Sequence, residues 1–171
     1  MTNVITTPFS NIYNSFLSKI TDDMYMELTE QDTYKMLEEL LMSAIHKFEF
    51  PRVNINDYVK TITDDKGESV EGYFNVILSN EEINILSTYM IVEWLGQQLA
   101  SVENTRMKYS GSDFKFTSQA NHLSKLLTLK KDYEREGFHL QRLYKRRKAD
   151  DNGIMRSTFD SIMSSSVRGN Q

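Results

Sequence analysis

The sequence predicts a mainly α protein: a small helical bundle with a long core helix and a long C-terminal helix, an inserted β-hairpin and a C-terminal tail. Four segments repeat apolar residues at the spacing of one helix face. Only 7 glycines and 2 prolines occur in 171 residues, which is too few for a loop-rich or all-β chain. The length favours one domain, so residues 1–148 are expected to form the helical domain and residues 149–171 a flexible tail.

The core helix is predicted over Ser79–Val102, which contains the only tryptophan. Ser79 and Glu82 have the spacing of a capping box, in which each side chain accepts a hydrogen bond from a backbone N–H of the first turn. Two small residues, Ser87 and Gly96, either mark the close approach of another helix or are simply tolerated. The predicted apolar face consists of Ile83, Leu86, Met90, Ile91, Trp94, Leu95, Leu99 and Val102.

Two shorter helices are predicted before the core helix. The Thr7 hydroxyl is expected to cap the first, which runs to about Lys19, with Pro8 at its first helical position, where a missing N–H does no harm. Thr29 is expected to cap the second, over residues 30–48. The buried face of the second helix is predicted to consist of Tyr34, Leu37, Leu40, Leu41, Ala44, Ile45 and Phe48.

A β-hairpin is predicted at about residues 58–78, because β-branched and aromatic residues flank a turn-type cluster there. A two-stranded hairpin is marginally stable alone. It is therefore expected to lie on the helices, to join another sheet or to reach a neighbouring subunit.

The last helix is predicted from Ser118 to about Lys148. Its apolar stripe is strong as far as Leu129 and thinner afterwards. We therefore expect it to be packed at its start and to protrude or meet a partner at its end, with Gly137 as a possible kink.

The predicted tail, residues 149–171, is poor in apolar residues except for one island. The apolar residues of this island would share one helix face, yet so short a segment does not form a stable helix alone. We expect it to become ordered on a partner. The partner-binding residues are predicted to be Ile154, Met155, Phe159, Ile162 and Met163.

Charge is distributed unevenly along the chain. The whole sequence has 24 acidic and 20 basic residues. Residues 1–104 contain 17 acidic and 6 basic residues, residues 105–148 contain 4 and 12, and residues 149–171 contain 3 and 2. Opposed halves can pair within one chain, or the basic half of one copy can pair with the acidic half of the next, which produces rings or filaments.

The sequence offers little for catalysis, cofactor binding or metal binding. It has no cysteine, which removes disulfides, zinc thiolates and a cysteine nucleophile. His46, His122 and His139 lack the spacing of metal ligands, and no phosphate-binding loop or nucleophile elbow occurs. Nor does any segment have the apolar length of a membrane span. We expect a protein that is not an enzyme and has no cofactor.

A basic cluster ends the last predicted helix, and three interpretations of it remain open. The cations bind DNA phosphates, or they complement the helix dipole in water, or they face the acidic half of a neighbouring copy. The cluster consists of Arg142, Lys145, Arg146, Arg147 and Lys148.

Three segments together resemble the head-to-tail connector, or neck adaptor, family of tailed bacteriophages and prophages. They are PFSNIYNSFLSKITDDMYMEL, ILSNEEINILSTYMIVEWLGQQLASVEN and SGSDFKFTSQANHLSKLLTLKKDYE. The family patterns match Asp22–Leu28, Glu81–Leu95 and Asp113–Leu123, and the resemblance covers about Phe9 to Tyr133. The basic cluster and the tail lie beyond it.

The resemblance implies a structural protein of the virion neck, assembled in the host cytoplasm. Such a protein forms a homo-oligomeric ring, here expected to be dodecameric, beneath the portal protein. The ring extends the channel through which DNA passes without sequence-specific binding, and a downstream neck or tail protein joins it. In this interpretation the tail docks on the portal, and the basic cluster lies at the portal junction or near the channel.

Two alternatives are kept. The first is a small helical DNA-binding or packaging accessory protein that uses the basic cluster, with affinity that falls steeply as salt rises. The second is a host-directed regulator that grips a protein with the apolar island of the tail.

Overall fold

The computed structural model describes residues 6–20, 29–63, 69–108, 116–149 and 155–157. Within these ranges the helices are α1 (Phe9–Leu17), α2 (Glu30–Ile45), α3 (Asn80–Lys108) and α4 (Phe116–Arg146). The strands are β1 (Thr7–Pro8), β2 (Tyr58–Val59), β3 (Ile62–Thr63), β4 (Ser69–Val70), β5 (Tyr73–Phe74), β6 (Arg147–Ala149) and β7 (Met155–Ser157). The predicted mainly α fold with an inserted hairpin is confirmed.

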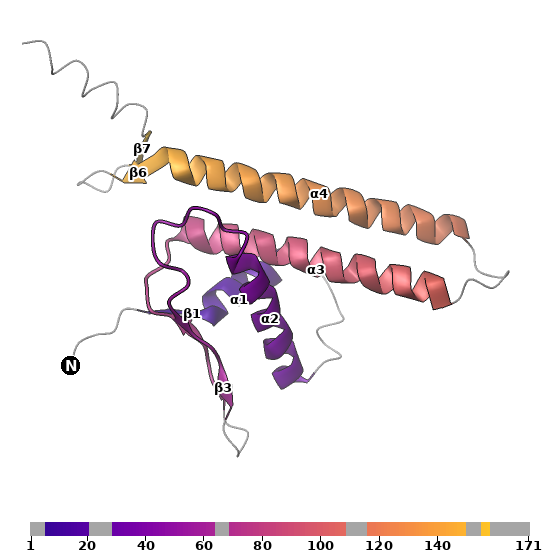
Figure 1. Ribbon diagram of the computed structural model, residues 1–171, viewed down its shortest axis with the longest axis horizontal. Coiled ribbons are helices and arrows are strands. Elements are labelled where there is room, and N and C mark those ends of the chain that lie inside the picture. Colours follow the sequence, from indigo (N-terminus) through magenta and orange to yellow (C-terminus); the bar gives the residue numbers. More distant parts are fainter. Residues whose placement is uncertain (1–5, 21–28, 64–68, 109–115, 150–154, 158–171) are drawn as a thin grey trace, which may run out of the picture.

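Helix α3 is the central element of the protein (Figure 1). Helices α1 and α2 pack on its first half, and α4 runs antiparallel to it on the other side. Because neighbours surround this half, every residue from Ile85 to Val92 is buried. None of residues 96–104 of α3 is buried, and there α3 and α4 leave the body as a pair. We call this pair, residues 96–108 and 116–132, the two-helix arm.

Two helix starts are capped as predicted. The Ser79 backbone N–H donates to Glu82 Oε2 at 2.7 Å, and the Glu82 N–H donates to Ser79 Oγ at 3.3 Å. At the start of α2, Thr29 Oγ1 accepts from the Asp32 N–H at 3.2 Å. Both caps satisfy backbone donors that have no partner within their own helix.

The predicted cap at Thr7 is wrong. The Thr7 side chain does not cap α1: the Ser10 N–H in the first turn of α1 donates to Glu71 Oε1, and Thr7 and Pro8 form strand β1, which pairs with β5. Thr7 Oγ1 instead donates to the Val76 carbonyl at 2.8 Å and accepts from the Leu78 N–H at 2.9 Å. The hydroxyl therefore fastens the start of the chain to the segment that leads into α3.

The predicted hairpin is divided into two short antiparallel ribbons. At its base, β5 lies between β2 and β1, so the hairpin does join another strand. Beyond the base, Ile62 of β3 is paired with Val70 of β4. Glu38 of α2 supports the point between the two ribbons, because its Oε2 accepts from the Thr61 N–H at 3.2 Å. We call β3 and β4 the hairpin arm; it projects from the body on the side away from α4 (Figure 1).

Helix α4 packs at the opposite end from the one expected. Its first half, with the stronger apolar stripe, belongs to the two-helix arm, and Leu127 and Leu129 are 46% and 44% exposed. The second half contacts the body through Gln141 and Tyr144, which are buried. Gly137 permits this approach, because a Cβ there would lie 2.9 Å from Tyr89 Cζ. The buried face of α4 therefore consists of a glycine and two residues that form hydrogen bonds. The spacing of apolar residues in the sequence does not reveal a buried face of this kind.

The two small residues of α3 have different surroundings. Ser87 marks a close approach of α1: its Oγ accepts from Ser15 Oγ at 2.9 Å and from Lys19 Nζ at 2.7 Å. Burial lowers the pKa of Lys19, whose ammonium also donates to Asn84 Oδ1 at 2.7 Å. Gly96 is half-buried, and a Cβ there would lie at an ordinary 3.6 Å from Lys130 Cε.

The surroundings of Gly72 and Gly96 predict opposite effects of alanine. A Cβ at Gly72 would lie 2.5 Å from the Phe9 ring and 2.8 Å from the Val59 carbonyl oxygen, so Gly72→Ala should lower the unfolding free energy by about 1–3 kcal/mol. Gly96→Ala should raise it by about 0.5–1 kcal/mol, because the helix interior has room for the methyl group. Urea denaturation of both variants tests this, and equal effects would contradict the packing described for Gly72.

Candidate functional site

The candidate site is the end of the body where α3 begins and α4 ends. At its centre is the Glu82 carboxylate, which is 3% exposed. Its Oε2 accepts from the N–H and the hydroxyl of Ser79 at 2.7 and 2.8 Å, and its Oε1 accepts from the Tyr144 hydroxyl. The Tyr144 oxygen in turn accepts from the Arg52 N–H at 2.9 Å. These bonds connect the start of α3, the end of α4 and the segment after α2, and we call this hydrogen-bonded network the junction.

Arg52 and Glu81 extend this junction to the surface. The Arg52 guanidinium lies 3.9 Å from the centroid of the Tyr144 ring and donates to the carbonyls of Tyr144 and Arg147. Glu81 forms two ion pairs: its Oε2 lies 4.0 Å from Arg52 Nη1, and its Oε1 lies 3.6 Å from Arg147 Nη1. Arg147 is therefore bound to the body through both its side chain and its carbonyl.

The C-terminal part differs from the prediction in secondary structure. The helix ends at Arg146, and Arg147–Ala149 form β6 instead of a last helical turn. Met155–Ser157 form β7, paired antiparallel with β6, although a helical face was predicted through Met155. The backbone hydrogen bonds of the strand pair replace those that a helix would have made. The other predicted partner-binding residues lie outside the described residues: Ile154, Phe159, Ile162 and Met163.

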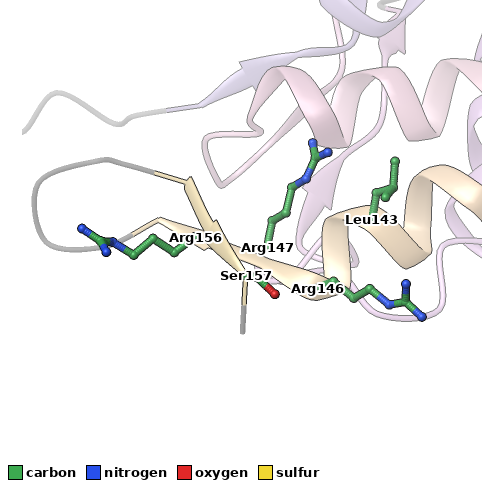
Figure 2. Close-up of a pocket in the computed structure, with 5 residues that line it drawn as sticks. All are labelled: Leu143, Arg146, Arg147, Arg156 and Ser157. Carbon is green, nitrogen blue, oxygen red and sulfur yellow. The ribbon is translucent and has the colours of Figure 1, made fainter. Parts of the chain in front are cut away.

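The basic cluster is distributed among different surroundings and is not one convergent site. Arg146 and Arg147 line a surface hollow with Arg156, Leu143 and Ser157, and their guanidinium groups point in different directions (Figure 2). Phosphate recognition needs donors that converge on one position. The hollow does not have this geometry.

Two further cations of the cluster, Lys145 and Arg142, lie beside exposed aromatic rings. Lys145 Nζ is 4.0 Å from the centroid of the Phe50 ring, and Arg142 Cζ is 5.9 Å from that of Phe138. Both rings are more than half exposed. The contact of Arg142 with Phe138 could have been predicted from the sequence, because residues four positions apart are neighbours on a helix. The contact of Lys145 with Phe50 could not, because it depends on tertiary structure. The side chain of Lys148 is not among those described.

Within the described part of the chain, no group of three or more His, Cys, Asp or Glu residues could hold a metal ion. His46, His122 and His139 lie on separate, exposed positions. A search of the same residues found no helix long and apolar enough to cross a membrane.

Comparison with known proteins gave no match: no protein-family model, no curated protein and no solved structure matches the chain.

The junction predicts the effect of removing one hydroxyl. Tyr144→Phe leaves the buried Glu82 carboxylate without one donor and the Arg52 N–H without its acceptor. The unfolding free energy should fall by about 1.5–3 kcal/mol, measured by urea denaturation. Tyr34→Phe is the control and should change it by less than about 0.5 kcal/mol, since Tyr34 is 44% exposed. Equal effects of the two substitutions would contradict the junction.

Buried tyrosines predict loss of stability at high pH. Burial raises the pKa of Tyr144, its hydrogen bond to Glu82 raises it further, and burial also raises the pKa of Tyr89. Above about pH 10 the unfolded chain loses phenol protons that the folded protein retains, so the unfolding free energy should fall as the pH rises.

Urea denaturation between about pH 9 and 11 measures this slope. Tyr144→Phe should make the slope shallower, because one of the responsible phenols is absent. An unchanged slope in that variant would show that Tyr144 does not contribute.

Proposed function

We propose that the protein is a structural head-to-tail adaptor of a tailed-phage virion. In this role it forms a ring beneath the portal protein, extends the DNA channel and receives a downstream neck or tail protein. It acts through shape and repeated interfaces, without catalysis.

The observation that carries the proposal is the presence of projecting apolar side chains on a helical body. Ile62 and Val70 of the hairpin arm are 61% and 67% exposed, and Leu127 and Leu129 of the two-helix arm are 46% and 44% exposed. Exposed apolar patches on projecting elements are typical of interaction surfaces. A subunit with several such surfaces suits a ring in which every copy contacts its neighbours.

The resemblance to the neck adaptors supports the same function. Two of its segments correspond to the principal long helices: Glu81–Leu95 is the buried half of α3, and α4 begins within Asp113–Leu123. The segment Asp22–Leu28 lies outside the described residues. The opposed charges of the two halves of the sequence also allow pairing between copies, beside the Glu81–Arg147 ion pair that joins the halves within one chain.

In the proposed assembly the C-terminal tail binds the portal. Strands β6 and β7 hold the start of this segment against the end of α4. The apolar residues Phe159, Ile162 and Met163 follow in the sequence and would supply the contact with the portal.

Cosedimentation with the portal ring of the same phage tests the function. The full chain should sediment with the portal in a fixed ratio. A variant that lacks residues 158–171 retains β6 and β7, so its helical fold should persist, and it should bind the portal at least about tenfold more weakly because the apolar anchor is absent.

Circular dichroism of the truncated variant serves as the folding control. Failure of the full chain to sediment with the portal would contradict the adaptor function. If duplex DNA instead shifted the full chain, with affinity that falls steeply with salt, the DNA-binding alternative would replace it.

A further inference from the structure

Two exposed phenylalanine rings and two cations lie together near the end of α4. Lys145 Nζ is 4.0 Å from the centroid of the Phe50 ring, and Arg142 Cζ is 5.9 Å from the centroid of the Phe138 ring. The two rings are 54% and 53% exposed, and both cations are exposed. We call these residues the ring-cation patch: Phe50, Phe138, Arg142 and Lys145.

The body holds the parts of the ring-cation patch in fixed positions. Its residues on α4 are three or four positions apart, so they share one face of the helix. Phe50 is held beside α4 by its neighbour in the chain, because the Glu49 N–H donates to Gln141 Oε1 at 2.9 Å. Lys145 follows Phe138 by seven positions and lies beside the Phe50 ring, which places the two rings about 10 Å apart along the helix axis. The patch therefore presents a ring, two cations and a second ring along one line.

The cations at this end of α4 suit an anionic polymer better than a single anion. The guanidinium groups of the neighbouring Arg146 and Arg147 point in different directions, so they do not converge on one phosphate (Figure 2). Among the described residues, neither Arg142 nor Lys145 forms an ion pair with a carboxylate. Cations that follow one another along a helix can contact successive phosphates of a flexible chain.

The exposed rings favour an unpaired strand over a duplex. In a duplex each base face is covered by the next base pair, and a protein reaches only the base edges and the backbone. An unpaired strand has free base faces, which stack on aromatic side chains while cations bind the backbone. Peptide partners are bound in grooves or at strand edges, whereas the ring-cation patch lies on an exposed flank of a helix.

We propose that the ring-cation patch binds single-stranded nucleic acid without sequence preference. Bases stack on Phe50 and Phe138, and the phosphates between them contact the two cations. Because the contacts involve only base faces and phosphates, DNA and RNA strands are equally suitable ligands. This activity goes beyond the proposed adaptor function and requires neither the ring nor the portal.

Fluorescence anisotropy of a labelled oligodeoxythymidine of about 16 nucleotides tests the role of the rings. The full chain should bind this strand at least about tenfold more tightly than a duplex of the same length, and an oligouridine as tightly. Phe50→Leu and Phe138→Leu keep an apolar side chain but remove the flat ring, so each should weaken binding about tenfold. Phe50→Tyr and Phe138→Tyr keep the ring and should keep the affinity.

The salt dependence of the same binding tests the role of the cations. Arg142→Gln combined with Lys145→Gln should make the slope of log Kd against log salt shallower by about 1.4, because each phosphate contact of a single strand contributes about 0.7. Lys125→Gln combined with Lys131→Gln is the matched control, since it removes the same charge from exposed positions of the same helix. The control should leave the slope nearly unchanged, and circular dichroism verifies the fold of every variant.

Equal affinity for the single strand and the duplex would overturn the proposal, as would binding that persists in both leucine variants. If the full chain bound no oligonucleotide and the leucine variants abolished its self-association, the patch would be a contact between copies, and the proposal would be wrong. None of these measurements includes the portal, so failure of this activity is distinguishable from failure of the adaptor function.

Discussion

The buried Glu82 carboxylate is the constraint on which the arrangement of the two long helices depends. A buried charge destabilises a fold by several kcal/mol unless hydrogen bonds compensate it, so its donors must remain in place. Ser79 holds one oxygen at the start of α3, and Tyr144 holds the other from the end of α4. Because α1 and α2 pack on the same half of α3, this end of the protein is a fixed body, and both arms project from it.

Local sequence signals predicted the elements of the fold better than their contacts. The capping box of Ser79 and Glu82 involves residues three positions apart, and the sequence alone contains all the information that it needs. Thr7 was wrongly predicted as a cap, because its actual partners lie 69 and 71 residues away. The packed end of α4 was also missed, since its contact depends on hydrogen bonds of Gln141 to distant groups, including the Lys47 carbonyl at 2.9 Å.

The candidate site could be located from the sequence only in part. The basic run correctly indicated an exposed cationic end of α4, but sequence spacing could not show that Arg147 is held by Glu81 while Lys145 lies beside Phe50. A helical face was predicted through Met155 from apolar spacing, whereas the pairing with β6 makes this segment a strand. In both cases tertiary partners, which one sequence does not reveal, decide the outcome.

A fixed body with two projecting apolar arms and opposed charges suits the repeated contacts of the proposed ring. Electron microscopy of portal rings incubated with the full chain tests the proposed assembly most directly, because it records both the arrangement and the partner. A ring-forming adaptor should give particles in which a second ring lies coaxial with the portal at one of its ends. Portal rings without added density, while the chain remains monomeric or coats DNA, would contradict it.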